Sequence, residues 1–209
     1  MSFDANHVLA LIVATSFAAG LNVYATVATL GLLGHFGALQ LPPALHLLES
    51  WPIIVIAVIL FLLELFADKI PYFDLVWNAA HTFIRVPVAA LVAYGASHQL
   101  SPEWQMASVA AATGISLVSH AGKTAIRAGV TPSPEPVSNT VISAGEDAFA
   151  IGLTWLATHH PYIAAAIALI LVVVLILLIR WIVLRLRAAI NRLLEGPRTT
   201  PTSPTGIAS

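Results

Sequence analysis

Two adjacent acidic residues, Glu146 and Asp147, lie near the middle of an otherwise apolar stretch that contains no lysine or arginine. Placing a charged side chain at the centre of a membrane helix costs about 2.5 to 3.5 kcal/mol on insertion scales, and such residues often mark ion or proton pathways. Asn139 and Ser143 fall at helical spacing on the face that includes Glu146. The pattern predicts a carboxylate site for a cation or proton. The alternative is a packing network in which Asn or Arg neighbours satisfy the two acids.

A second pair of carboxylates, Glu64 and Asp68, lies four residues apart near the end of another apolar segment, and Lys69 follows directly. Two carboxylates on one helix face could bind a hard cation. Asp68 and Lys69 could equally cap the helix at the membrane interface. Asn22, in the first apolar stretch, joins the candidate ion-binding residues because an amide in lipid needs a hydrogen-bonding partner.

Two stripes of polar residues recur at intervals of three and four, the spacing of one helix face. The first consists of Asp74, Asn78, His81 and Arg85, and the second of His120, Lys123 and Arg127. Together with Lys69, these residues are candidates for lining or gating a cavity. Alternatively, the first stripe belongs to an amphipathic helix on the cytoplasmic surface and the second receives an anion or marks the cytoplasmic edge of the membrane.

The familiar catalytic signatures GxSxG, HExxH, Walker A and GxGxxG do not occur, and the chain has no cysteine. The pair His159–His160 is typical of a solvated turn rather than a metal site, since adjacent helical positions point apart. We therefore expect neither an enzyme nor a cofactor. The remaining catalytic alternative is a membrane lipid enzyme that uses Asp74, His81 and Glu64 as an acid-base set.

These side chains must be positioned by membrane helices, because 58% of the 209 residues are hydrophobic and 9% are charged, giving a mean hydropathy of +0.89. The apolar residues form long unbroken runs, which are typical of helices buried in lipid. We predict an all-α polytopic transmembrane helical bundle, a single domain over residues 1–196. Its six spans cover about residues 8–33, 51–67, 86–97, 106–119, 137–157 and 162–179, followed by a basic helix at 180–194 and a disordered tail at 197–209. The first span, about 40 Å long as a helix, either tilts, breaks near Gly20 or folds back as a re-entrant hairpin.

The basic residues can all be placed on one side of such a bundle. They are Lys69, Arg85, Lys123, Arg127, Arg180, Arg185, Arg187, Arg192 and Arg198. The positive-inside rule makes that side, with the C-terminus, the cytoplasm. If the first stretch is re-entrant, the N-terminus lies outside and the other assignments stand. So few basic residues, several of them beside a membrane helix, argue against a nucleic-acid partner.

Three polar strings resemble a bacterial membrane-protein family catalogued as domain of unknown function 4126. They are AGLNVYATVATLGLLG (19–34), ELFADKIPYFDLVWNAAHTFIR (64–85) and SPEPVSNTVISAGED (133–147). The resemblance covers about residues 19–194 and supports the fold, with multi-pass insertion in the inner (cytoplasmic) membrane. It brings no biochemical role.

The intramembrane acids favour a small transporter or channel for a cation or proton, with carboxylates lining a polar cavity. The alternative is a non-transporting scaffold or lipid-binding protein acting through the basic helix at 180–194. Expected partners are membrane lipid and a small ion or small molecule. Gly31 and Gly34 could support close helix contact in a homodimer.

Overall fold

The computed structural model describes residues 5–67, 70, 73–130 and 136–195. Its helices are α1 (Ala5–Leu21), α2 (Val23–His35), η1 (Pro43–Glu49), α3 (Trp51–Ala67), α4 (Phe73–Ala96), α5 (Pro102–Val130), α6 (Pro136–His159) and α7 (Pro161–Glu195). Of the predicted site residues, Asp68 and Lys69 lie outside the described residues. The side chains of Asp74, Asn78 and Asn139 are not described either.

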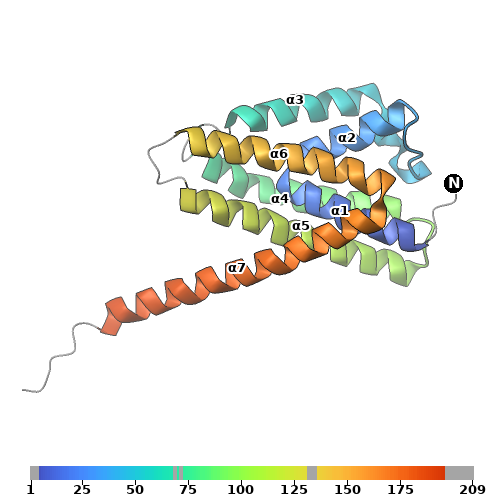
Figure 1. The fold of residues 1–209 in the computed structure, drawn as a ribbon. Helices are drawn as coiled ribbons and strands as arrows, with labels where there is room; N and C mark the ends of the chain where they lie inside the picture. Colours follow the sequence, from blue (N-terminus) through green and yellow to red (C-terminus); the bar gives the residue numbers. More distant parts are fainter. Residues whose placement is uncertain (1–4, 68–69, 71–72, 131–135, 196–209) are drawn as a thin grey trace, which may run out of the picture.

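The first apolar stretch folds back on itself inside the bundle as a hairpin of α1 and α2 (Figure 1). The two helices meet at Asn22. The start of α1 lies beside the end of α2, where Val8 and Leu30 belong to one buried cluster. With 17 and 13 residues, the helices are about 25 and 20 Å long, and each is shorter than a hydrocarbon core of about 30 Å. Residues 8–33 therefore form a helical hairpin instead of one continuous helix.

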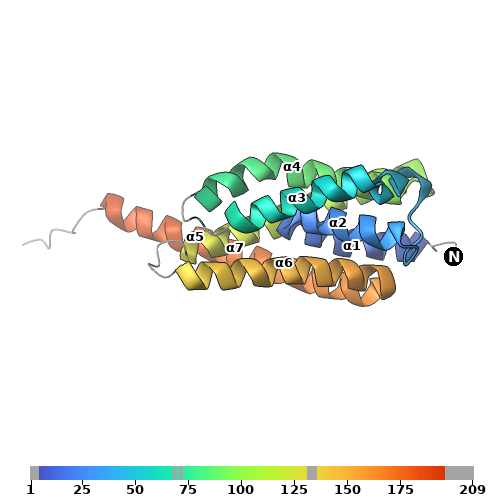
Figure 2. The same ribbon diagram turned by 90° about the horizontal axis from the view of Figure 1, so that it is seen from above.

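The helices α3 to α7 then run alternately along the bundle (Figure 1, Figure 2). α3 begins beside the end of α2, where the rings of His35 and Trp51 lie 4.6 Å apart. α7 has 35 residues, about 52 Å of helix, and it extends past its neighbours at the end where α5 stops and α6 begins. We call this the basic end, since α7 carries Arg185, Arg187 and Arg192 there. The predicted spans at 51–67, 137–157 and 162–179 fall within α3, α6 and α7.

The third and fourth predicted spans are parts of longer helices. α4 runs without interruption through the segment that the sequence could place on the cytoplasmic surface, and α5 continues well beyond residue 119. The physical reason is that the described basic residues of both stripes face inward: Arg85 of α4 and Lys123 of α5 are 0% and 1% exposed. Partners inside the bundle satisfy these two side chains, so neither of them needs a place on the surface.

Small residues allow the hairpin to pack closely against its neighbours. Gly20 of α1 meets α5 so tightly that an added Cβ would lie 2.5 Å from the Ser116 carbonyl oxygen and 2.7 Å from the Ser119 Cβ. Close approach through small residues is the usual way in which membrane helices associate. Gly31 and Gly34 of α2 make similar contacts with Leu48 and Glu49 of the same chain. A side chain at either position would therefore clash within the subunit.

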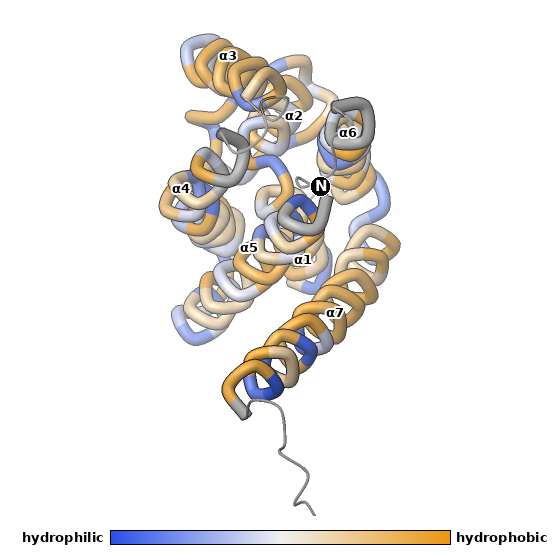
Figure 3. Tube along the Cα trace, turned by 90° about the vertical axis from the view of Figure 1, so that its left-hand side faces the viewer, coloured by the Kyte–Doolittle hydropathy of each residue, from blue (hydrophilic) through white to orange (hydrophobic). Residues whose placement is uncertain are grey.

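The outer surface of the bundle is apolar. Figure 3 shows α3 and α7 coloured hydrophobic over most of their length, with hydrophilic positions towards the free end of α7. By length and hydropathy, α4 and α7 can cross a membrane, and η1 with α3 would be a third crossing if the pair, bent by 63°, forms one span. Large exposed apolar surfaces are rare in soluble monomers. The predicted fold class, an all-α transmembrane helical bundle, is confirmed.

Candidate functional site

The break between α1 and α2 exposes a backbone carbonyl in the interior. Asn22 is extended, with φ −149° and ψ 102°, and its side-chain Oδ1 accepts the Ala25 N–H at 2.9 Å. That N–H would otherwise bond to the Leu21 carbonyl in a continuous helix. The Leu21 carbonyl instead accepts hydrogen bonds from Arg85 Nη1 and Lys123 Nζ, each at 3.1 Å. The tip of the hairpin is thus held by cations from α4 and α5.

Glu64 of α3 sits opposite the same two cations and is fully buried. Its Oε1 accepts hydrogen bonds from Arg85 Nη2 and from Lys123 Nζ, the latter at 3.1 Å. Its Oε2 has no hydrogen-bond partner among the described residues. The carboxylate is therefore bound by two bases through one oxygen, and its second oxygen is enclosed by the bundle.

Glu146 of α6 binds the other side of Lys123. Glu146 Oε2 accepts from Arg127 Nη2 at 2.7 Å and Arg127 Nε at 3.2 Å, and it lies 3.6 Å from Lys123 Nζ. Lys123 thus bridges Glu64 and Glu146. The neighbouring Asp147 accepts a hydrogen bond at Oδ1 from Asn22 Nδ2 at 2.8 Å, which ties α6 to the hairpin tip.

We call Glu64, Arg85, Lys123, Arg127, Glu146 and Asp147 the charge cluster. Its three acids and three bases balance to zero when all are ionised. Five of the six residues are at most 4% exposed, and the Glu146 side chain is 12% exposed. Burying one such charge without a partner would cost several kcal/mol, so balance is what allows the cluster to exist inside an apolar bundle.

A histidine extends the cluster towards the outer face of α4 and α5. His120 Nδ1 lies 3.1 Å from Arg85 Nη1, and His120 Nε2 lies 2.7 Å from Thr82 Oγ1. A guanidinium can only donate hydrogen bonds, so Nδ1 must be the acceptor and the ring proton must be on Nε2. His120 is therefore neutral in this arrangement, and a second ring proton would break its contact with Arg85.

His81, also predicted as a cavity or gating residue, lies apart from these ion pairs. Its Nδ1 lies 2.7 Å from the Trp77 carbonyl oxygen, and its ring stacks on the Trp77 ring with centroids 4.3 Å apart. Tyr24 meets the same imidazole edge to face at 5.7 Å. His81 joins α4 to the hairpin through aromatic contacts.

The structure brings together eight of the predicted residues: Asn22, Glu64, Arg85, His120, Lys123, Arg127, Glu146 and Asp147. The bound acids match the alternative reading, a packing network with Asn and Arg partners. Among the described residues, no group of three or more His, Asp or Glu is arranged to hold a metal ion. The charged residues of the second polar stripe face the interior, where they pair with acids from other helices.

Sequence reasoning missed two partners of this site. The Leu21 carbonyl carries no side-chain signal, and only the Gly20–Leu21–Asn22 break pointed to a free carbonyl in this region. Thr82 precedes Arg85 by three residues, so it lies on the same helix face, and that spacing could have found it.

Two surface crevices reach the site, and apolar side chains form most of their walls. One, of about 230 Å³, lies between α1, α5, α6 and α7 and reaches Lys123 and Glu146. The other, of about 520 Å³, lies between α4 and α5 and passes Thr82 and His120. The cluster thus meets the outside through largely apolar openings.

The fold and the site together define a small polytopic membrane protein in which a helical hairpin ends on a buried, charge-balanced cluster. Residues 9–181 match the family described as Domain of unknown function (DUF4126). The chain belongs to that family, as its three polar strings predicted. No curated protein matches the chain, and no solved structure does.

Proposed function

We propose that the chain is a small membrane transporter or channel that moves a proton or another cation, and that the charge cluster is its transport site. The observation that carries this proposal is the position of three carboxylates and three bases at the tip of a broken hairpin inside the bundle. Broken helices and buried ionisable groups are recurrent features of transport sites in membranes.

A proton that binds to the cluster would disturb its charge balance. Adding a proton to Glu146 removes the negative charge that compensates Arg127 and part of Lys123. Uncompensated cations in an apolar interior are unstable. The bases must therefore move, bind an anion or change their contacts with the other members of the cluster. Lys123 also bonds to Glu64 and to the Leu21 carbonyl, so this change would reach the hairpin tip.

The orientation of the chain is part of the proposal. The arginines at the free end of α7 favour a cytoplasmic basic end in the inner membrane, with the C-terminus inside. The re-entrant hairpin then places the N-terminus on the outer side. Membrane lipid and a small ion or molecule are the proposed partners, and a homodimer remains part of this proposal.

Glu146→Gln is expected to reduce proton flux at least about tenfold, because the neutral amide cannot carry the exchanging proton. The measurement is the change in fluorescence of a pH-sensitive dye inside proteoliposomes after a potential or pH gradient is applied. Glu103→Gln is the matched control, since Glu103 is fully exposed at the start of α5. Equal flux in wild type and Glu146→Gln, or no flux in either with both proteins folded, would contradict the proposal.

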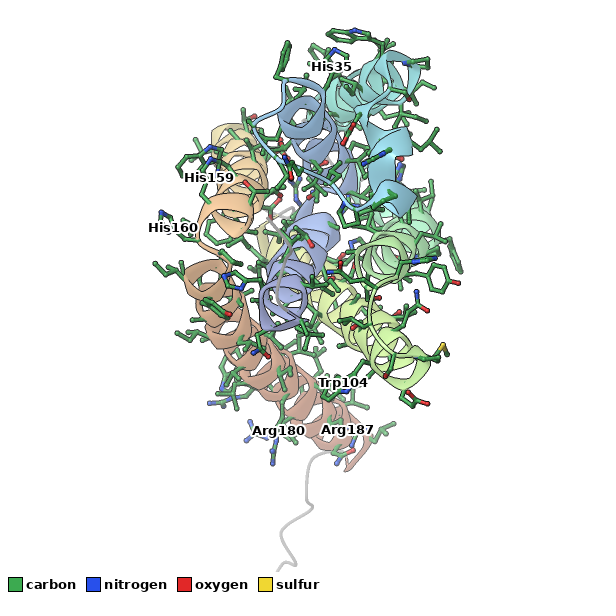
Figure 4. All side chains as sticks on the ribbon, turned by 90° about the vertical axis from the view of Figure 1, so that its right-hand side faces the viewer. His35, Trp104, His159, His160, Arg180 and Arg187 are labelled. Carbon is green, nitrogen blue, oxygen red and sulfur yellow. The ribbon has the colours of Figure 1, made fainter. Side chains whose placement is uncertain are left out.

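A second candidate function, lipid binding by a non-transporting scaffold, rests on the free end of α7. Figure 4 shows Arg180 and Arg187 on α7, away from His159 and His160. At 100° per residue, Ile182, Leu186, Ile190 and Leu193 share one face of this helix, and the arginines lie outside that face together with apolar residues such as Leu184. A basic amphipathic helix of this kind suits anionic lipid headgroups.

The triple variant Arg185→Gln/Arg187→Gln/Arg192→Gln is expected to retain less anionic lipid than wild type. Each arginine near an anionic surface contributes about 1 kcal/mol, so selectivity should fall by about two orders of magnitude. The measurement is the ratio of phosphatidylglycerol to phosphatidylcholine retained after detergent extraction from mixed bilayers. Asn191→Ala, an uncharged change on the same exposed turn, is the control. An unchanged ratio in the triple variant would rule out this candidate.

A further inference from the structure

The crevice between α1, α5, α6 and α7 opens on the apolar surface of the protein. Ile126, Phe149 and Val174 line it and remain 39% to 51% exposed. Val174 belongs to the uncharged run of α7 that spans residues 161–179, so the opening faces the hydrocarbon of the bilayer rather than its headgroups. A molecule that enters the crevice must therefore come from lipid.

Glu146 keeps one oxygen available at the inner end of the crevice. Its described hydrogen bonds and ion pairs, with Arg127 and Lys123, all go to Oε2. The side chain is 12% exposed, and the carboxylate is part of the crevice wall. Oε1 is thus the oxygen that can take up a proton or meet a small molecule without displacing either base.

Glu64 provides the contrast within the same cluster. Its side chain is 0% exposed, and it does not belong to the wall of this crevice. Its uncommitted Oε2 is enclosed by the bundle. Both acids interact with Lys123. They differ in exposure, because only Glu146 lines the crevice.

The charge at the inner end determines which molecule fits. Lys123 and Glu146 carry opposite charges 3.6 Å apart, so this end attracts neither a lone cation nor a lone anion strongly. The remaining wall consists of Phe17, Leu21, Ile126, Phe149, Leu171, Val174 and Leu175. Apolar walls with a small number of convergent polar groups are typical of small-molecule sites.

We infer that this crevice binds a small neutral lipophilic molecule from the bilayer and brings it to Glu146, the carboxyl of the cluster that is open to exchange with the outside. This inference rests on the proposed function for its role in proton exchange. The binding site itself depends only on the crevice and on the free Glu146 oxygen.

Dicyclohexylcarbodiimide is the probe, because it is neutral, lipophilic and reactive towards protonated carboxyl groups. The carboxylic proton adds to one nitrogen of the carbodiimide while the carboxyl oxygen bonds to its central carbon. The resulting O-acylisourea rearranges to a stable N-acylurea, so the whole reagent adds and nothing leaves. Wild-type protein in bilayers is treated, digested and mapped by mass spectrometry. We expect modification at Glu146 and little at Glu64.

Val174→Trp is expected to lower the modification of Glu146 by about tenfold, because the larger ring fills the crevice. Val173→Trp is the matched control: its side chain is similarly exposed but is not part of the crevice wall, and labelling should persist. Absence of label at Glu146, preferential label at Glu64, or equal labelling in the two tryptophan variants would overturn the inference. Label at Glu146 without proton flux would support the site and contradict the proposed function alone.

Discussion

Glu64→Leu is expected to lower the free energy of unfolding by about 3 to 5 kcal/mol, the usual cost of removing one partner from a buried ion pair. Glu64 binds Arg85 and Lys123, and the side chains of all three residues are completely buried. Leucine has a similar size but removes the carboxylate to which both cations bind. The free energy of unfolding can be measured by titration with sodium dodecyl sulfate in mixed micelles.

The double variant Glu64→Leu/Arg85→Leu separates charge balance from packing. It leaves Lys123 and Arg127 with Glu146 and Asp147, two bases with two acids, so it should be more stable than Glu64→Leu alone. Glu103→Leu, a change at an exposed acid, should leave stability much closer to wild type than Glu64→Leu does. A double variant as unstable as the single, or a single variant as stable as wild type, would show that balance does not hold the cluster together.

The sequence predicted which residues are expensive in a membrane, but it did not predict their partners. Glu146, Asp147 and Glu64 were recognised because carboxylates in apolar runs are costly. Their partners are remote: Asn22 and Asp147 are separated by 125 positions, and Glu64 and Lys123 by 59. Helical spacing reports which residues share a face, whereas pairing between helices depends on packing that one sequence does not reveal.

The hairpin illustrates the same limit. The excess length of the first apolar stretch predicted a tilt, a break or a hairpin, and Gly20 with Asn22 located the break. Hydropathy could not distinguish these options, because it gives the length of an apolar segment but not the direction in which the chain runs after a break. The choice depends on tertiary contacts: Gly20 approaches α5 closely, and Val8 and Leu30 pack in one cluster.

The charge cluster also explains why a membrane bundle tolerates a broken helix. A break leaves backbone groups unsatisfied, and lipid cannot satisfy them. In this chain Asn22 satisfies the Ala25 N–H, while Arg85 and Lys123 satisfy the Leu21 carbonyl. The acids then neutralise the cations that the break requires. Charge and backbone geometry are therefore parts of one arrangement, and a change in either should alter the other.

Asn22→Ala is the second variant with a large expected effect. Loss of the helix cap at Ala25 costs about 1 kcal/mol, and loss of the hydrogen bond to the buried Asp147 costs about 1 to 3 kcal/mol. The expected decrease in the free energy of unfolding is therefore about 2 to 4 kcal/mol. Asn22 is 0% exposed, so water cannot replace either bond without entering the bundle. The same detergent titration measures the change.

Asn22→Ser separates the two bonds, because serine is also a good N-cap but is too short to keep both the cap and the contact with Asp147. Its cost should be smaller than that of Asn22→Ala by about 1 kcal/mol. Asn191→Ala, an exposed change on α7, should leave stability unaltered. If Asn22→Ala and Asn22→Ser both behaved like this control, other contacts would hold the hairpin tip. If only alanine were disruptive, the cap would dominate, and the link from the hairpin to α6 would contribute little to stability.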